Sequence, residues 1–298
     1  MSKALVLSGG GPVGIAWQTG LAAGLARRGV VLADAQLILG TSAGSAVGAQ
    51  LALRRDLEEQ LARYEAAGVQ AADAAPEGTG GGGGGPTDRM ARLMELLAEA
   101  AKEDGSPQET RRVVGRFALE AETFPEDRFV ERFRYLAGER WPAAFRCTAV
   151  DAETGEFKVW DPGSGAELDR AVASSCAVPG IFPPITIAGR RYMDGGVRSG
   201  ASVDLAAGQE RVLLVTLMGG ARAGADAPGF AAMRARGDRE IETVREAGGT
   251  VEVLSPDPES AAVMGMNLMD PSLGPAAAAA GARQGEAAAD GLRAFWAD

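Results

Sequence analysis

The chain has 298 residues and a mass of 30.5 kDa, and 46% of its residues are hydrophobic, enough for one large core. Its formal charge of −10 argues against nucleic acid as a partner, and we expect at most transient contact with a membrane surface. With no histidine and two cysteines, Cys147 and Cys176, it has too few ligands for a conventional zinc or haem site, so neither a metal nor a cofactor is expected. The chain shows no basic, apolar leader and no apolar run of membrane-spanning length, which predicts a cytoplasmic protein.

The first predicted element is a strand at residues 4–7, followed by a glycine-rich turn at 8–14 and an apolar helix at 15–28. The turn contains three consecutive glycines, Gly9, Gly10 and Gly11. Their N–H groups can face an oxyanion, which makes the turn a candidate oxyanion hole. With Gly14 the segment also fits Gly-x-Gly-x-x-Gly, so a nucleotide-binding protein of the flavin or NAD type remains an alternative.

A second predicted strand at residues 37–39 runs into Gly40-Thr41-Ser42-Ala43-Gly44, a Gly-x-Ser-x-Gly motif, and then into a helix. This pattern predicts Ser42 as a nucleophile at a helix N-terminus, where developing negative charge is stabilised. Side chains at Gly40 and Gly44 would crowd such a turn. The simpler interpretation is a tight turn with an N-capping serine. A dinucleotide site would require an acidic residue at the end of this strand, and the nearest one, Asp34, precedes it.

Residues 56–140 have the pattern of an insertion. Helical periodicity is present at residues 56–67, 89–102, 110–121 and 127–136. The glycine run at residues 80–85 has no side chains to pack and predicts a mobile loop. We interpret the insertion as a helical cap over Ser42 that forms an acyl pocket or serves only as scaffold.

Without histidine, the base that activates Ser42 is expected to be a carboxylate beside a tight glycine turn. Asp194, followed by Gly195 and Gly196, fits this description, although Asp-Gly is also a common hairpin turn. The rival carboxylates Asp151 and Asp204 have no flanking glycine pair. An aspartate has a reference pKa of about 3.9, which partial burial and neighbours would raise. Substantial activity is still expected at about pH 5.5, where a histidine base would be mostly protonated.

Five ordered segments together resemble the patatin-like phospholipase family of serine acyl hydrolases. They are residues 9–14, 40–44, 149–156, 173–184 and 194–196. The resemblance implies a single domain over residues 1–298, with a three-layer α/β/α sheet and a helical cap insertion. It also implies a Ser42–Asp194 dyad, an oxyanion hole in the glycine-rich turn, and hydrolysis of carboxylic esters of lipids through an acyl-enzyme. Acyl transfer to an acceptor other than water would use the same intermediate, and a catalytically silent lipid-binding module is a further alternative.

The chain departs from the family pattern at Val13, where an arginine or lysine often stands, and this puts a preference for phospholipid headgroups in doubt. Arg198, which follows the proposed base, could supply a positive charge near the site, although a solvent-facing position is the commoner outcome. The remaining chain predicts a buried strand at residues 211–218, a helix at 230–247, a strand at 250–254 and a final helix at 276–296. The methionine-rich stretch at residues 263–269 suits core packing better than an acyl-chain wall.

Overall fold

The structure is a computed structural model that describes residues 1–71, 86–100, 106–217 and 228–297. The predicted glycine loop at 80–85 lies outside these residues. Within them, eight strands form one mixed sheet. The strands are β1 (Lys3–Leu7), β2 (Leu37–Gly40), β3 (Phe145–Asp151), β4 (Phe157–Trp160), β5 (Ile185–Ile187), β6 (Arg190–Asp194), β7 (Arg211–Val215) and β8 (Thr250–Leu254).

The order across the sheet is β5-β6-β3-β2-β1-β7-β8, and β4 pairs with β3 off this path. Neighbouring strands are parallel along the path β3-β2-β1-β7-β8, whereas β4, β5 and β6 are antiparallel to their partners. The α-helices are α1 (Gly11–Arg27), α2 (Ala43–Ala52), α3 (Leu57–Ala71), α4 (Pro86–Ala100), α5 (Pro107–Glu120), α6 (Glu126–Val130), α7 (Leu168–Ser175), α8 (Pro228–Glu246), α9 (Pro258–Met264) and α10 (Gly274–Trp296). Short 3₁₀ helices include η2 (Glu131–Leu136), η3 (Gly195–Val197) and η4 (Val203–Ala206).

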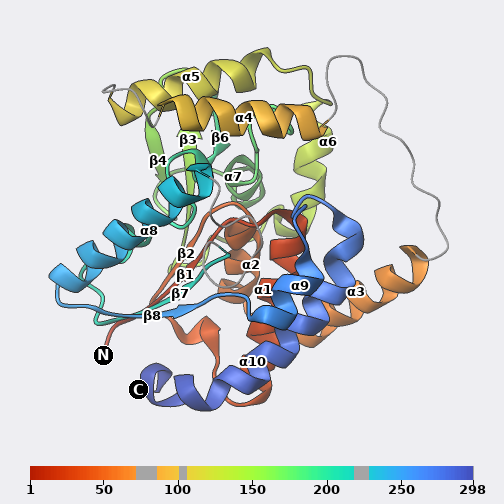
Figure 1. Cartoon of the computed structure of the whole chain (residues 1–298), viewed down its shortest axis with the longest axis vertical. Helices are drawn as coiled ribbons and strands as arrows, with labels where there is room; N and C mark the ends of the chain where they lie inside the picture. Colours follow the sequence, from red (N-terminus) through yellow and green to blue (C-terminus); the bar gives the residue numbers. More distant parts are fainter. Residues whose placement is uncertain (72–85, 101–105, 218–227, 298) are drawn as a thin grey trace.

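Alternate side chains of the central strands pack into two hydrophobic cores, one on each face of the sheet. Leu5 and Leu7 of β1 point into the core shared with α1, α2 and α10, while Ala4 and Val6 point into the core shared with α8 and η4. The sheet is therefore covered by helices on both faces (Figure 1), and the predicted three-layer α/β/α fold is confirmed.

Helices α1 and α10 lie in very close contact along a row of glycines. A Cβ atom on Gly20 would lie 2.0 Å from the Ala278 carbonyl oxygen, and one on Gly281 would lie 2.2 Å from the Trp17 carbonyl oxygen. No side chain fits between these backbones, because real Cβ contacts are essentially never shorter than 3.0 Å. This glycine seam fixes α1, and with it the glycine-rich turn that precedes the helix, against the C-terminal part of the chain.

The predicted helices of residues 56–140 are present, the last of them divided between α6 and η2. Helices α4 and α5 lie over the end of β3 and β6 (Figure 1), where Leu93 and Val114 pack against Val150 and Met193 in a third hydrophobic cluster. Helix α3 packs instead beside α1 and α10. In the described part of the chain, no helix combines the length and the apolar character needed to cross a membrane.

Candidate active site

Strand β3 brings the two predicted catalytic residues together. Gly40, at the end of β2, pairs with Cys147, and Asp194, at the end of β6, pairs with Ala149 two residues further along β3. Ser42 lies two residues beyond Gly40, at the same level of the sheet as Asp194. The Ser42 hydroxyl lies close enough to the Asp194 carboxylate to lower the pKa of that carboxyl.

Ser42 lies on a sharp strand-to-helix turn with φ 52° and ψ −122°, a conformation that a residue with a Cβ rarely adopts. Gly44 is required at this turn, because a Cβ there would lie 2.1 Å from the Leu7 carbonyl oxygen. Two residues for which no role had been predicted fix the Ser42 backbone. The Ser42 N–H donates to the Ser175 hydroxyl at 3.0 Å, and the buried Cys176 thiol donates to the Ser42 carbonyl at 3.1 Å.

Asp194 is 4% exposed, and this burial raises the pKa of its carboxyl from 3.8 to about 7. A hydrogen bond from the Gly196 N–H, at 2.7 Å, and the nearby Ser42 hydroxyl act in the opposite direction and limit the rise of the pKa. Gly195 packs against Thr148, where a Cβ would lie 2.2 Å from the threonine hydroxyl. The carboxylate therefore lies in a closed turn beside the serine, as a general base requires.

The two rival carboxylates are engaged elsewhere. Asp151 accepts hydrogen bonds from the Thr154 N–H and hydroxyl and forms an ion pair with Arg190 at 2.8 Å. Asp204 accepts hydrogen bonds from both terminal guanidinium nitrogens of Arg198. The expectation of a solvent-facing Arg198 was therefore wrong, because this neighbouring carboxylate holds the side chain in a half-buried position.

The glycine-rich turn lies against the nucleophile, since a Cβ on Gly9 would lie 3.3 Å from the Ser42 Cβ. The Gly9 N–H donates to the Gly200 carbonyl at 2.9 Å and is therefore engaged. The N–H groups of Gly10 and Gly11 have no acceptor among the described residues. The Gly14 N–H donates to the Gly10 carbonyl at 2.8 Å and begins the helical turn. Of the three predicted oxyanion donors, Gly10 and Gly11 are thus the ones available to a ligand.

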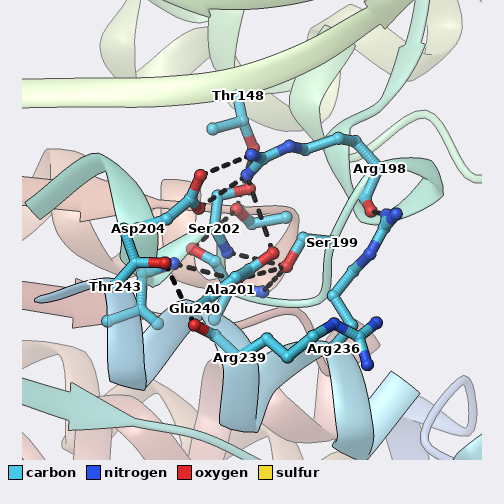
Figure 2. A network of polar contacts seen from close by, with 12 residues as sticks. Thr148, Arg198, Ser199, Ala201, Ser202, Asp204, Arg236, Arg239, Glu240 and Thr243 are labelled. Atoms are coloured by element: carbon cyan, nitrogen blue, oxygen red, sulfur yellow. Dashed lines mark hydrogen bonds and ion pairs between the residues drawn. The ribbon is translucent and has the colours of Figure 1, made fainter. Parts of the chain in front are cut away.

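A polar network anchors the loop that follows Asp194 and contacts the glycine-rich turn (Figure 2). Glu240 on α8 is 7% exposed, and its carboxylate accepts hydrogen bonds from the Ser199 hydroxyl at 2.8 Å and the Val203 N–H at 3.2 Å. Ser199 in turn accepts from the Ser202 N–H at 3.0 Å. These bonds fix the loop on both sides of Gly200, whose carbonyl holds Gly9 beside the nucleophile. Neither Glu240 nor Ser199 lies in a motif that would have identified this role from sequence.

Ser42 opens onto a cavity of about 400 Å³. Its walls are mainly apolar and aromatic and come from distant parts of the chain: Ile15, Tyr64, Phe129, Phe133, Val178, Phe182 and Met269. Helices α3 and α6 and the 3₁₀ helix η2, all within the predicted insertion, contribute part of these walls. Of the methionine-rich stretch, Met264 is fully buried in the core, as expected, whereas Met269 lines the cavity.

The dinucleotide alternative finds little support in this geometry. No acidic side chain contributes to the described walls of the cavity, whereas a ribose would require one. A Cβ on Gly11 would lie 2.6 Å from the Leu268 carbonyl oxygen, so the chain itself closes over one side of the turn. In the part of the chain that the structure describes, no group of three or more potential ligands could hold a metal ion.

The chain was compared with known families and structures. A family model described as "Patatin-like phospholipase" matches residues 5–207. Among solved structures, VipD from Legionella pneumophila is similar, with 14% sequence identity and a TM-score of 0.46, over 97% of this chain and 67% of that chain. No curated protein matches the sequence. The family match includes the glycine-rich turn, the Ser42 motif and the Asp194 turn.

Proposed function

This chain belongs to the patatin-like phospholipase family, and we propose that it cleaves carboxylic esters of lipids with Ser42 as nucleophile and Asp194 as general base. Family membership supports lipid acyl hydrolysis as the general activity. The observation that carries the more specific proposal is the Ser42 hydroxyl beside the buried Asp194 carboxylate, whose pKa it lowers, at the edge of the apolar cavity.

In the proposed reaction, Asp194 accepts the Ser42 proton while the serine oxygen attacks the ester carbonyl carbon. The oxyanion that forms accepts hydrogen bonds from the N–H groups of Gly10 and Gly11. As the tetrahedral intermediate collapses, protonated Asp194 gives its proton to the leaving alcohol, and the acyl group remains on Ser42. Water then attacks the acyl-enzyme, with Asp194 again as base, and releases a carboxylic acid.

Two features of the site favour this chemistry. A base works best when its pKa lies near the working pH, and burial brings the pKa of Asp194 to about 7. The glycine-rich turn is held in place before substrate arrives, through the bond between Gly9 and Gly200, so its donors need little reorganisation during the reaction. The apolar walls suit an acyl chain, whereas the chain's net charge of −10 favours no more than transient contact with an anionic membrane.

The test is labelling with a fluorophosphonate, followed by location of the modified residue by peptide mass. Ser42→Ala should abolish both labelling and ester hydrolysis, whereas Ser272→Ala, at an exposed serine, should behave as the wild type. Labelling that persists on Ser8 or Ser199 in the Ser42→Ala protein would overturn the assignment. Adding an alcohol acceptor such as glycerol distinguishes hydrolysis from acyl transfer, because transfer yields a new ester in place of free acid.

A further inference from the structure

The charges around the catalytic cavity are opposite in sign to those of the chain as a whole. The chain has 40 acidic and 30 basic residues, yet the charged side chains that line the described cavity are two arginines, Arg63 and Arg132. Asp194 is buried and is not among the residues that line the described cavity. A cavity with this lining attracts anions, although the protein as a whole repels them.

The two arginines differ in their partners. Arg63 forms an ion pair with Glu59 at 2.7 Å, so its charge is balanced locally. Arg132 has neither an ion pair nor a hydrogen bond to any residue that the structure describes. The five N–H donors of its guanidinium group are therefore available to solvent or to a ligand.

Three aromatic rings position the Arg132 guanidinium. Its central carbon lies 5.3 Å from the ring centroid of Phe124, 5.5 Å from that of Phe129 and 5.4 Å from that of Phe182. Phe129 and Phe182 stack with centroids 4.4 Å apart, and both line the cavity. Cation–π contacts of this kind fix the side chain through the ring faces and leave its N–H edges unoccupied.

The rings cover part of the cation, while the Arg132 residue as a whole stays exposed to solvent. Burial lowers the pKa of the Arg132 guanidinium, and the positive charge of Arg128 lowers it further. An anion that reaches Arg132 would offset both effects. The planar guanidinium matches the oxygen geometry of phosphate and carboxylate groups, which it binds through paired hydrogen bonds.

Building on the proposed function, we propose that Arg132, held by Phe124, Phe129 and Phe182, forms an anion subsite of the catalytic cavity. It binds a phosphate or carboxylate group carried by the ester that Ser42 attacks, so Arg132 selects anionic esters over neutral ones of similar size. The anion lies either on the acyl side or on the alcohol side of the scissile bond, and the two substrate pairs below distinguish these sources.

The experiment measures kcat/KM for two matched pairs of esters. The acyl-side pair is 4-nitrophenyl butyrate and the 4-nitrophenyl monoester of glutaric acid, and the alcohol-side pair is phenyl butyrate and its para-phosphorylated analogue. In at least one pair, Arg132→Gln should lower the ratio of kcat/KM for the anionic ester to kcat/KM for the neutral ester by roughly tenfold. This factor is at the low end of the range for a charge-assisted hydrogen bond, because the site is accessible to solvent. Arg132→Lys should retain part of the preference, because it keeps the charge without the planar fork.

Arg134→Gln is the matched control. Arg134 lies two residues away, is 76% exposed and pairs with Glu131, so its loss should leave both ratios unchanged. Ratios that are the same in the wild type and in Arg132→Gln would refute the anion subsite while leaving the hydrolase proposal intact. Equal loss of preference in Arg134→Gln would refute it as well, because the effect would then come from general surface charge.

A binding measurement separates this inference from the hydrolase proposal. Ser42→Ala protein is titrated calorimetrically with decyl phosphate, decanoate and decanol. The subsite is supported if either anion binds more tightly than decanol and this difference is lost when Arg132→Gln is added to the Ser42→Ala protein. This result would hold even if no ester is cleaved. Equal binding of all three ligands would overturn the subsite even if the wild type is an active hydrolase.

Discussion

Asp194→Asn should stabilise the folded protein at neutral and alkaline pH while it removes the proposed base. Burial raises the pKa of this carboxyl from 3.8 to about 7. At 1.36 kcal/mol per pKa unit, ionising Asp194 above pH 7 disfavours the folded state by up to about 4 kcal/mol. Asparagine has the same shape and no charge, and its carbonyl can still accept the bond from Gly196. It loses the interaction of a carboxylate with the Ser42 hydroxyl and the charge on the bond from Gly196, so we expect a net gain of about 1–3 kcal/mol at pH 8.

The gain should depend on pH in a defined window. Well below pH 3.8 the carboxyl is protonated in both folded and unfolded chains, so it does not affect their balance. Between pH 3.8 and 7 the unfolded chain loses this proton first, and the wild type loses stability relative to Asp194→Asn as the pH rises. Above pH 7 both states are ionised, and the difference stays constant.

Urea unfolding of the wild type and Asp194→Asn at pH 4 and pH 8 measures this difference. Asp238→Asn controls for the loss of one negative charge, because Asp238 is exposed on α8. If the stability difference between the wild type and Asp194→Asn proved the same at both pH values, or if the variant were the less stable protein at pH 8, the burial argument would be refuted.

The same pKa predicts the acidic limb of catalysis. Only the ionised carboxylate accepts the serine proton, so kcat/KM for a short-chain nitrophenyl ester should rise with pH through about 7. The sequence predicted substantial activity near pH 5.5, but burial raises the pKa further than expected, and the acidic limb should lie close to that of a histidine enzyme. A limb centred below pH 5 would show that Asp194 is better solvated than the structure indicates.

Ser42→Gly should exceed Ser42→Ala in stability by about 1 kcal/mol or more, because glycine adopts the positive φ of this turn without strain; equal urea midpoints would contradict this. Glu240→Leu leaves the Ser199 hydroxyl and the Val203 N–H without their acceptor, so it should cost about 1–3 kcal/mol of stability and lower kcat, whereas Glu240→Gln should lose less of both. The exposed Glu242→Gln is the control, and full activity of Glu240→Leu would argue against a positioning role for the network.

The sequence predicted those parts of the site in which chemistry and backbone geometry are encoded locally. The turns at Ser42 and Asp194 carry their own glycines. The alternation of β1 side chains between the two cores and the long helical patterns follow from side-chain spacing. The three-layer fold was implied by the family resemblance that the ordered motifs carry.

Properties that depend on contacts between distant segments could not be predicted in this way. Arg132 reaches the cavity from the insertion, and Glu240 reaches the catalytic loop from α8. The pKa of Asp194 reflects burial by several elements, and the engagement of Gly9 depends on a carbonyl that lies 191 positions later in the chain. Arg198 was misjudged for a different reason: its partner Asp204 is only six positions away, but the loop conformation decides that the two side chains meet.

The glycine seam between α1 and α10 has a consequence for how this sequence can change over time. The family match ends at residue 207, whereas α10 begins at Gly274, so one partner of the seam lies inside the matched region and the other outside it. At Gly20 and Gly281 each backbone occupies the space that a side chain on the other would need. A larger residue at either position therefore requires a compensating shift of the partner helix. We expect substitutions in the two segments to be coupled.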